Sequence, residues 1–410
     1  MSAPALRFKE FDGDWKSFSL LDLSSDKTLN NGVFNDQNKV GKGYKLINVL
    51  DMYIDRDIDE SRLSLLDLSK QEFERNKVKY GDIFFTRSSL VKEGIAYSNV
   101  YLGSSNDITY DGHLIKLSPN LEQINSIFLN YGLKTSKVRK QLIQGGKTAT
   151  MTTIGQKEIA STKIDVPFLQ EQTKIASFLS AIDEKISQLT QKHQLLSQYK
   201  QGMMQKLFSQ QIRFKADDGS EFEGWEETIF EKIGVFLKGK GISKADIVPD
   251  GKIPCIRYGE LYTYYGEVIS KIISSTNIEA TNLVLSKAND ILIPASGETQ
   301  IDIATASCVL QDNIALSGDL NIFRTKENGI FLSYLIRSKL KMQIAQLAQG
   351  NSVVHLYASQ LKGVSFSLPC LEEQTKIANF LSAIDQKIEV VAQQIEQAKQ
   401  WKKGLLQQMF

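Results

Sequence analysis

An arginine set among small hydroxyl side chains follows the apolar run at residues 81–85. Guanidinium and hydroxyl groups donate hydrogen bonds to phosphate oxygens, and arginine also matches the edge of a guanine base. A loop at the end of a strand would present these groups to such a ligand, whereas a surface arginine without a ligand is the alternative interpretation. The candidate contact residues of this stretch are Thr86, Arg87, Ser88, Ser89 and Lys92.

The second half of the chain offers a different set of polar and aromatic side chains. Tyrosine hydroxyls bind phosphates and tyrosine rings pack on sugars, although ordinary packing within the protein is the alternative. The loop at 294–298 follows a similar apolar run but contains no arginine, so the two halves would not share one contact. The candidates here are Arg257, Tyr258, Tyr262, Tyr264, Tyr265 and Ser296.

Two glycine-rich polar turns occupy equivalent places at 144–148 and 349–352. Glycine lets a backbone approach a phosphate closely, and a plain connecting loop is the alternative. The candidate contacts in and beside these turns are Lys147, Thr148, Asn351 and His355.

No catalytic constellation stands out in the sequence. Gly146-Lys147-Thr148 resembles the end of a phosphate-binding P-loop, but Gln141 stands where that motif requires its first glycine. A Pro-Pro dipeptide, which the amino-methyltransferase motif contains, is absent, and the 3 histidines are scattered along the chain. The sequence therefore predicts a binding protein with no catalytic residue, metal site or cofactor of its own.

The elements that would position these residues are revealed by an internal repeat. Residues 169–186 and 371–388 are identical at 15 of 18 positions, with an offset of 202 that continues without a gap to residue 410. Upstream, Arg7-Phe8-Lys9 and a following Trp15 recur as Arg213-Phe214-Lys215 and Trp225, while the residues between these landmarks differ. The chain is thus predicted to be a tandem duplication of two related but diverged domains, each followed by a nearly identical helix.

Both repeated segments follow a proline and carry apolar residues at an average spacing of 3.5, which is typical of a coiled-coil seam. A helix of about 38 residues would be roughly 57 Å long. The two segments carry the same seam on one chain, so we predict that they pair as an antiparallel coiled coil. The predicted seam residues are Ile175, Leu179, Ile182, Ile186, Leu189, Ile377, Leu381, Ile384, Ile388 and Val391.

Two further features of the helices allow more than one interpretation. Lys200 and Lys402 share a seam position, where a lysine either fixes the register or extends its amine to solvent. Near-identity outside the seam indicates that both copies dock the same partner, although core packing is the alternative for the two phenylalanines. The predicted docking residues are Glu171, Gln172, Lys174, Phe178, Glu373, Gln374, Lys376 and Phe380.

The remaining segments read as mixed α/β, with short strands near 81–86 and 290–294 and short helices near 121–143 and 328–348. The predicted fold class is α+β with a pseudo-twofold internal repeat. The predicted parts are a first domain at 1–166, a central helix at 167–211, a second domain at 212–368 and a C-terminal helix at 369–410.

Composition places limits on the cellular setting. The 410 residues carry a net charge of +2, so any nucleic-acid contact requires clustered basic groups or a partner's positive charge. The apolar runs are too short to cross a bilayer, and the 3 cysteines form no CxxC pair. We expect a cytoplasmic protein without a membrane association.

The duplicated EQTKIA…FLSAID helices, with the (G/N)DI(F/L) strands and the QG…P segments before each helix, resemble the specificity subunits of type I restriction-modification systems. The resemblance covers essentially the whole chain. It implies two target-recognition domains that bind double-stranded DNA, two methyltransferase subunits as partners, and restriction subunits in the full complex. It also implies that S-adenosylmethionine is held by the methyltransferase partner.

These observations predict a subunit that confers DNA sequence specificity and is not itself an enzyme. Each domain would read one half of a bipartite, asymmetric site, and the coiled coil would set the spacer between the halves. The alternative is a scaffold that pairs two copies of a partner protein and does not bind DNA.

Overall fold

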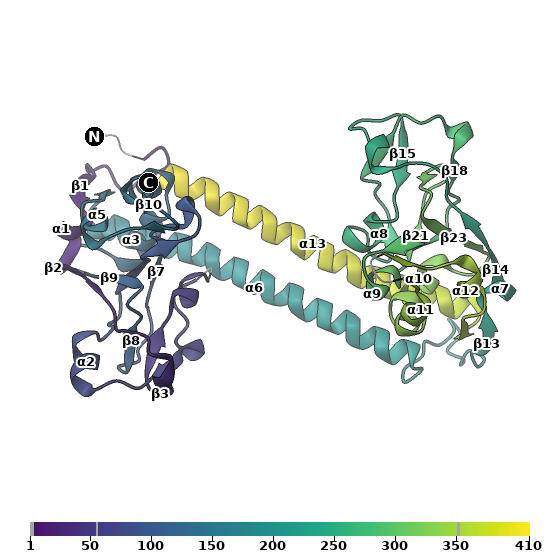
Figure 1. Cartoon of the computed structure of the whole chain (residues 1–410), viewed down its shortest axis with the longest axis horizontal. Coiled ribbons are helices and arrows are strands. Elements are labelled where there is room, and N and C mark those ends of the chain that lie inside the picture. Colours follow the sequence, from purple (N-terminus) through teal and green to yellow (C-terminus); the bar gives the residue numbers. More distant parts are fainter. Residues whose placement is uncertain (1–3, 55, 351–352) are drawn as a thin grey trace. The chain divides into compact units, whose positions relative to one another are not determined.

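The computed structural model describes residues 4–54, 56–350 and 353–410. The chain forms two compact units (Figure 1). Unit 1 comprises Met1–Thr190 with Gln393–Phe410, and unit 2 comprises Gln191–Ala392. Each unit therefore combines one α/β domain with a portion of both long helices.

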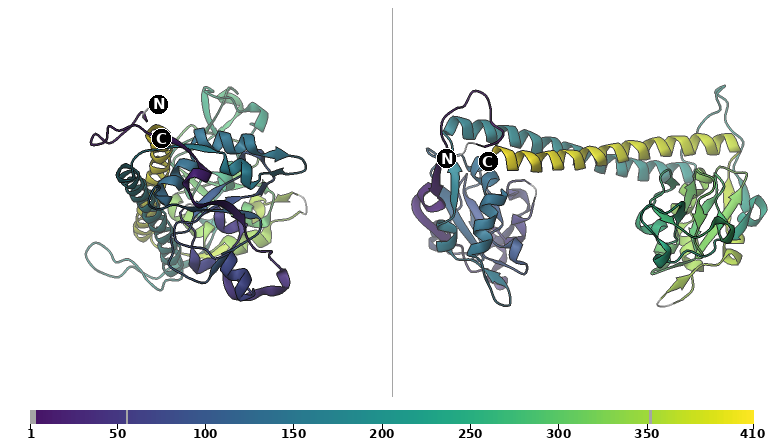
Figure 2. Two further views of the ribbon diagram at one scale, coloured as in Figure 1. Left: turned by 90° about the vertical axis from the view of Figure 1, so that its left-hand side faces the viewer. Right: turned by 90° about the horizontal axis from the view of Figure 1, so that it is seen from above.

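The two repeated segments form the long helices α6 (Leu169–Phe208) and α13 (Leu371–Met409). In unit 1 the start of α6 lies beside the end of α13, where Phe178 packs edge-on against Trp401. In unit 2 the end of α6 lies beside the start of α13, where Lys200 pairs with Asp385. The helices are thus antiparallel within each unit, as predicted, and lie along one side of its α/β body (Figure 2).

The predicted seam is apolar and almost completely sequestered from solvent. Nine of its ten residues are buried, and Ile388 is half-buried. The seam residues near each helix start join the core of the adjacent domain as well as the other helix, because Ile175 and Leu179 belong to the cluster that contains Phe128. The first turns of each helix are therefore part of a domain core, whereas Leu189 and Val391, farther along the seam, belong to neither domain cluster.

The described residues of unit 1 form four sheets. The central, antiparallel one has the order β2-β9-β5-β7 and the second has the order β4-β3-β8. The other two are β10-β11-β6 and β1-β12. The strands are β1 (Lys16–Ser19), β2 (Ser24–Asn31), β3 (Val40–Ile47), β4 (Ser64–Leu66), β5 (Ile83–Thr86), β6 (Ser88–Ser89), β7 (Ser98–Val100), β8 (Ile108–Tyr110), β9 (Leu114–Pro119), β10 (Lys147–Thr148), β11 (Thr152–Thr153) and β12 (Lys163–Val166).

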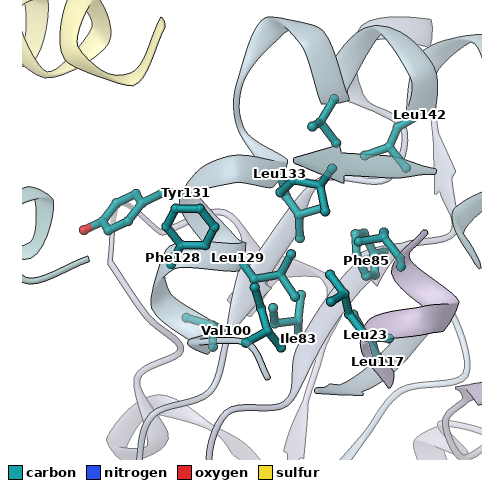
Figure 3. Close-up of a cluster of buried hydrophobic side chains, with 14 of the residues drawn as sticks. Leu23, Ile83, Phe85, Val100, Leu117, Phe128, Leu129, Tyr131, Leu133 and Leu142 are labelled. Carbon is teal, nitrogen blue, oxygen red and sulfur yellow. The ribbon is translucent and has the colours of Figure 1, made fainter. Parts of the chain in front are cut away.

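The α-helices of this domain are α1 (Leu20–Leu23), α2 (Lys70–Arg75), α3 (Ser126–Leu133), α4 (Ser136–Gly145) and α5 (Gln156–Ala160). Helices α3 and α4 fall where the sequence predicts them. Helix α3 is capped by Asn125, whose side chain accepts the backbone N–H groups of Ile127 and Phe128. Its apolar face packs on Ile83 and Phe85 of the central strand β5 (Figure 3).

Figure 3 also shows that Tyr131 of α3 directs its hydroxyl group away from this apolar cluster. Burial of each large apolar side chain contributes about 1.5–3 kcal/mol, so α3 is held to the sheet mainly by its Phe and Leu residues. The tyrosine hydroxyl is then free to make a polar contact outside the core.

Unit 2 repeats this plan, because the order β14-β23-β19-β21 matches β2-β9-β5-β7, with β16 added at the edge. Its second sheet has the order β17-β15-β22-β18, and the pairs β20-β24 and β13-β25 complete the domain. The strands are β13 (Glu226–Ile229), β14 (Gly234–Lys238), β15 (Ile253–Ile256), β16 (Val268–Ile269), β17 (Ser274–Thr276), β18 (Val284–Leu285), β19 (Ile291–Pro294), β20 (Ser296–Gly297), β21 (Ser307–Val309), β22 (Ala315–Leu316), β23 (Leu320–Thr325), β24 (Val354–His355) and β25 (Ser365–Leu368).

The short helices of unit 2 are α7 (Phe230–Ile233), α8 (Glu260–Thr263), α9 (Gln300–Ile303), α10 (Gly329–Arg337), α11 (Lys341–Leu347) and α12 (Ala358–Lys362). Helices α10 and α11 again fall where the sequence predicts them. The α+β class and the internal repeat are confirmed. In the part of the chain that the structure describes, no helix is both long and apolar enough to span a bilayer.

Candidate nucleic-acid interface

The two predicted contact stretches of the first domain meet in one small sheet. Strand β11 pairs on one side with β6, which places Thr153 opposite Ser88, and on the other side with β10, which places Thr153 opposite Lys147. A groove of ≈ 470 Å³ lies beside this sheet. Residues lining it include Arg87, Ser88, His113, Lys147, Thr153 and Glu158.

Arg87 has a fixed backbone and an available head group. Its N–H donates to the His113 carbonyl at 2.9 Å, and its own carbonyl accepts from the Ile154 N–H at 3.0 Å. Within the described residues, no hydrogen bond or ion pair engages its exposed guanidinium group. The arginine is thus positioned as a donor for an external anion or base edge.

Two exposed groups flank Arg87 in the groove. The imidazole Nδ1 of His113 lies 2.8 Å from Asp111 Oδ1, which orients the ring. The Lys147 amine is mostly exposed and lies 3.8 Å from Glu158. His113 was not among the predicted contacts, although it follows an Asp-Gly turn and its carbonyl group accepts the Arg87 N–H just after β5.

Thr86 corrects the sequence-based prediction. This residue ends strand β5, is fully buried, and accepts a hydrogen bond from the Tyr97 N–H through its Oγ1. It therefore supports the strand and does not reach a ligand. Ser89 and Thr148 lie in the same small sheet, whereas Lys92 begins an exposed 3-10 turn and does not line the groove.

The second domain has the same small pairing in the same place, built from different side chains. Strand β20 pairs with β24, so that Ser296 lies opposite His355. His355 is exposed and its ring is stacked with Tyr357 at a centroid distance of 6.2 Å. Ser296 is buried, which corrects its prediction as a contact, and its hydroxyl has no partner among the described residues. Asn351 lies outside the described residues.

Arg257 and the tyrosines lie around α8. The Arg257 Nε donates to Glu260 Oε1 at 3.2 Å, so this guanidinium group is partly engaged. Tyr258 is half-buried against an apolar cluster, whereas Tyr264 is exposed. Tyr265 is buried and its hydroxyl accepts from the Ile273 N–H, which assigns it to the core and corrects its prediction as a contact.

Tyr262 lies in α8, is half-buried, and has its ring centroid 6.5 Å from that of Tyr258. Burial, followed by the influence of Tyr258 and of the carboxylates of Glu298 and Asp302, raises the pKa of Tyr262. Its phenol therefore stays protonated at neutral pH and can donate a hydrogen bond.

The EQ pair at the start of each long helix has a structural role within its own unit. Glu171 accepts two hydrogen bonds from Arg7, both at 2.7 Å. Gln172 accepts the Asn125 N–H that opens α3 and donates to the Pro167 carbonyl. These contacts join the N-terminal segment, α3 and α6.

The second copy repeats this anchor. Glu373 accepts from Arg213 and, at 3.1 Å, from the Trp225 indole. Gln374 accepts the Asn328 N–H. All four EQ side chains, which are Glu171, Gln172, Glu373 and Gln374, are buried in this way. Their prediction as partner-docking contacts is therefore wrong, because no surface remains on them for a partner.

The other predicted docking residues retain part of their surface. Phe178 packs edge-on against Phe8, and Phe380 packs against Phe214, so core packing explains much of both. The Lys174 amine lies 5.5 Å above the Phe8 ring and its side chain is half exposed. Lys376 pairs with Asp217. Docking by these four residues stays a prediction.

The last aspartate of the repeated motif joins each helix pair to its domain. In unit 1, Asp183 binds both Lys402 of α13 and the Tyr131 hydroxyl of α3. In unit 2, Asp385 binds Lys200 at 2.7 Å and the Tyr334 hydroxyl of α10.

These ion pairs separate the two interpretations of the seam lysines. Lys200 and Lys402 are each largely shielded from water and turned toward a carboxylate of the other helix. A lysine that extended its amine to solvent would make neither contact. The observed geometry therefore favours lysines that fix the register of the helix pair.

A family model described as the type I restriction modification DNA specificity domain matches residues 13–198 and 223–400. The two matches cover both units of the duplication and most of the chain. The chain belongs to this family. Within it, the repeated helices and the diverged small sheets are the corresponding parts of the two specificity domains.

Curated relatives agree with this assignment. A putative type I restriction enzyme specificity subunit, MjaX, of Methanocaldococcus jannaschii is 27% identical over 406 residues, which cover 97% of this chain and 93% of the relative. The MjaVIII specificity subunit of the same organism is 25% identical over 336 residues, covering 77% of this chain and 76% of the relative.

Solved structures show the same fold. The S subunit of a type I restriction-modification system from M. genitalium matches with a TM-score of 0.60 at 15% identity, covering 100% of this chain and 99% of that one. A chain from a structural study of the assembly of a type I R-M system matches with a TM-score of 0.56 at 13% identity, covering 97% of each. The specificity-subunit fold is thus retained here despite low sequence identity.

Proposed function

We propose that this specificity subunit recognises a bipartite, asymmetric DNA site, with one half read by each domain and the spacer set by the paired helices. The observation that carries the proposal is the small sheet beside β5 and β19. It occupies the same place in both domains but presents Arg87, Ser88 and Lys147 in one and His355 in the other, where the facing Ser296 is buried. Duplicated scaffolds with different exposed donors are suited to two different half-sites.

The partners in this proposal are two methyltransferase subunits, joined by restriction subunits in a cytoplasmic complex. The near-identical helix starts offer one similar outer surface in each unit, on which Lys174 is still exposed. The subunit itself is proposed to be non-catalytic, with S-adenosylmethionine bound by the methyltransferase. The net charge of +2 agrees with DNA binding that is shared with the methyltransferase subunits, because neutralising many phosphates needs more positive charge than this chain carries.

Sequencing of modified bases tests this proposal directly. The chain is produced in a host together with its methyltransferase, and methylated positions are mapped across the genome. We expect one motif with two different half-sites and a fixed spacer. Methyl transfer by the purified chain alone would contradict the non-catalytic role. A complex that gives no sequence-selective mobility shift with DNA would favour the scaffold alternative.

Replacement of Arg87 by alanine tests the first groove. The change removes a free guanidinium group without touching the core, so we expect discrimination at the first half-site to fall by about 1–3 kcal/mol. The second half-site should be read as before. Binding titrations with DNA changed one base at a time measure both effects. Lys16→Ala, an exposed change on β1, is the matched control, and equal losses in the two variants would argue against a direct contact.

A further inference from the structure

One arginine in each domain binds backbone carbonyl groups where an ion pair would be expected. Arg139 of α4 donates to the carbonyls of Glu93, Ile95 and Ala96 at 2.7, 2.6 and 2.6 Å. Among the described residues, no carboxylate hydrogen-bonds this guanidinium group. Burial lowers the pKa of Arg139, which reflects the cost of placing a cation there. The contact is therefore a specific clamp on one loop.

The clamped loop is strained and adjoins the groove. Ala96 has a positive φ of 49°, a conformation that a residue with a Cβ rarely adopts without external support. Its N–H donates to the Thr86 carbonyl at 3.1 Å, directly before Arg87. The Ile95 side chain also lies close to Gly146, which precedes Lys147. The clamp thus fixes both sides of the site that presents Arg87.

Arg337 makes the matching arrangement in unit 2. Its Nε donates to the Ala306 carbonyl at 2.6 Å, and its Nη2 donates to the carbonyls of Leu261 and Tyr265, both at 2.8 Å. Ala306 precedes β21, as the segment clamped by Arg139 precedes the equivalent strand β7. The carbonyl groups of Leu261 and Tyr265 lie on either side of Tyr262 and Tyr264 in the sequence, so Arg337 holds the segment that carries these two tyrosines.

The two arginines do not correspond in the duplication. When the copies are aligned on Tyr131 and Tyr334, Arg337 corresponds to Lys134 and Arg139 corresponds to Met342. The same kind of contact is therefore supplied from different positions of the helical layer. A simple inherited packing residue would have kept its place, so the recurrence indicates a requirement of the loop that is held.

We propose that Arg139 and Arg337 are positioning residues for DNA reading, each holding the contact loops of its own domain in the conformation that discriminates between bases. The inference rests on the proposed function, since it assigns the selectivity of each half-site to the rigidity of one loop. Neither arginine needs to touch DNA. Loss of the clamp should let the loop adopt other conformations that accept other bases.

The test uses Arg139→Gln and Arg337→Gln in the full chain assembled with its methyltransferase. Lys140→Gln and Lys339→Gln are the matched controls, because they remove an exposed charge beside each clamp. We expect Arg139→Gln to reduce discrimination at the first half-site about tenfold or more and to leave the second unchanged, which corresponds to at least one lost base contact. Arg337→Gln should give the reciprocal result, and both controls should match the natural chain.

A second measurement does not depend on DNA. Amide hydrogen exchange at residues 87–97 should become faster in Arg139→Gln and stay unchanged in unit 2. If a glutamine variant does not fold, the Arg139→Lys and Arg337→Lys variants are measured in its place. A lysine keeps the positive charge but lacks the planar set of N–H donors of the guanidinium group. Equal loss at both half-sites, or unchanged exchange, would overturn the positioning role. A different result would overturn the proposed function instead. In that case amide hydrogen exchange would be faster in the variant, but the natural complex would not recognise a bipartite DNA site.

Discussion

Replacing Glu373 with alanine is expected to destabilise unit 2 by about 3 kcal/mol. The carboxylate is fully buried and accepts from both Arg213 and the Trp225 indole. Its removal leaves the half-buried guanidinium group of Arg213 without the carboxylate that it binds, and we expect that loss to exceed the free energy of a surface pair several-fold. It also detaches the segment before β13 from the start of α13.

The measurement is chemical unfolding monitored by hydrogen exchange in each unit, because the two units need not unfold together. Glu372→Ala removes the adjacent, exposed carboxylate and should change stability by less than about 0.5 kcal/mol. Glu171→Ala should produce the corresponding loss in unit 1, where Arg7 is the partner. Equal stability of the Glu372 and Glu373 variants would show that the anchor is not structural.

Replacing Lys200 with methionine is the second change with a large expected effect. The amine lies between two carboxylates, 2.7 Å from Asp385 and 2.9 Å from Glu267. Without it, two partly buried negative charges face each other, so we expect unit 2 to lose about 2–3 kcal/mol at pH 8. In unit 1, Lys402 contacts the carboxylate of Asp183, and Lys402→Met is expected to cost less.

The loss in the Lys200 variant should depend on pH. Burial, followed by the charge of Glu267, raises the pKa of Asp385, while Lys200 acts to lower it and Tyr334 donates a hydrogen bond to it. A carboxylate whose pKa is raised in the folded chain destabilises the fold once it ionises, so stability falls as pH rises through that pKa. Without the lysine, the pKa of Asp385 rises further.

The difference between Lys200→Met and the natural chain should therefore shrink as pH falls from the raised pKa toward the ordinary pKa of an aspartate. Unfolding titrations across this range measure it. Lys402→Met, with its single carboxylate contact, is the control for the loss of a seam lysine as such. A deficit that stays constant with pH would mean that lost packing of the lysine stem, and not charge repulsion, causes the destabilisation.

The helices could be predicted from sequence because their signal is local and duplicated. A seam spacing of 3.5 residues needs no knowledge of the rest of the fold. The order of the domain landmarks also recurs, which predicted the repeated α+β plan. The small sheets at β6, β11, β20 and β24 could not be predicted, because strands of two residues carry no periodic pattern.

The role of the EQ pair illustrates the limit. Glu171 and Arg7 are separated by 164 residues in sequence, so their contact depends on how the whole first domain folds. A signal did exist: an Arg and a Trp recur upstream of a recurring Glu in both copies. Residues kept together in two diverging copies indicate mutual contact, whereas identity of the helix by itself suggested an external partner.

The exposure of the candidate contact residues could not be predicted from the sequence either. Thr86 and Arg87 are neighbours in sequence, but the first lies inside the sheet and the second at the groove. The alternation of strand side chains allows either residue to be the outward one until the sheet partners are known. His113 reaches the groove only through the turn between β8 and β9. Loop geometry set by distant strands thus decides which polar residues are available.

The division of the chain into its two units has a consequence for biosynthesis. Unit 2 is a continuous stretch, but the core of unit 1 includes Leu405 and Met409, which are translated after all of unit 2. On the ribosome, the first domain must therefore emerge, and remain incomplete, while the second is synthesised and folds. Because incomplete domains expose apolar surface, we expect the N-terminal domain to expose its core for longer than the second domain does, although it is the first to be made.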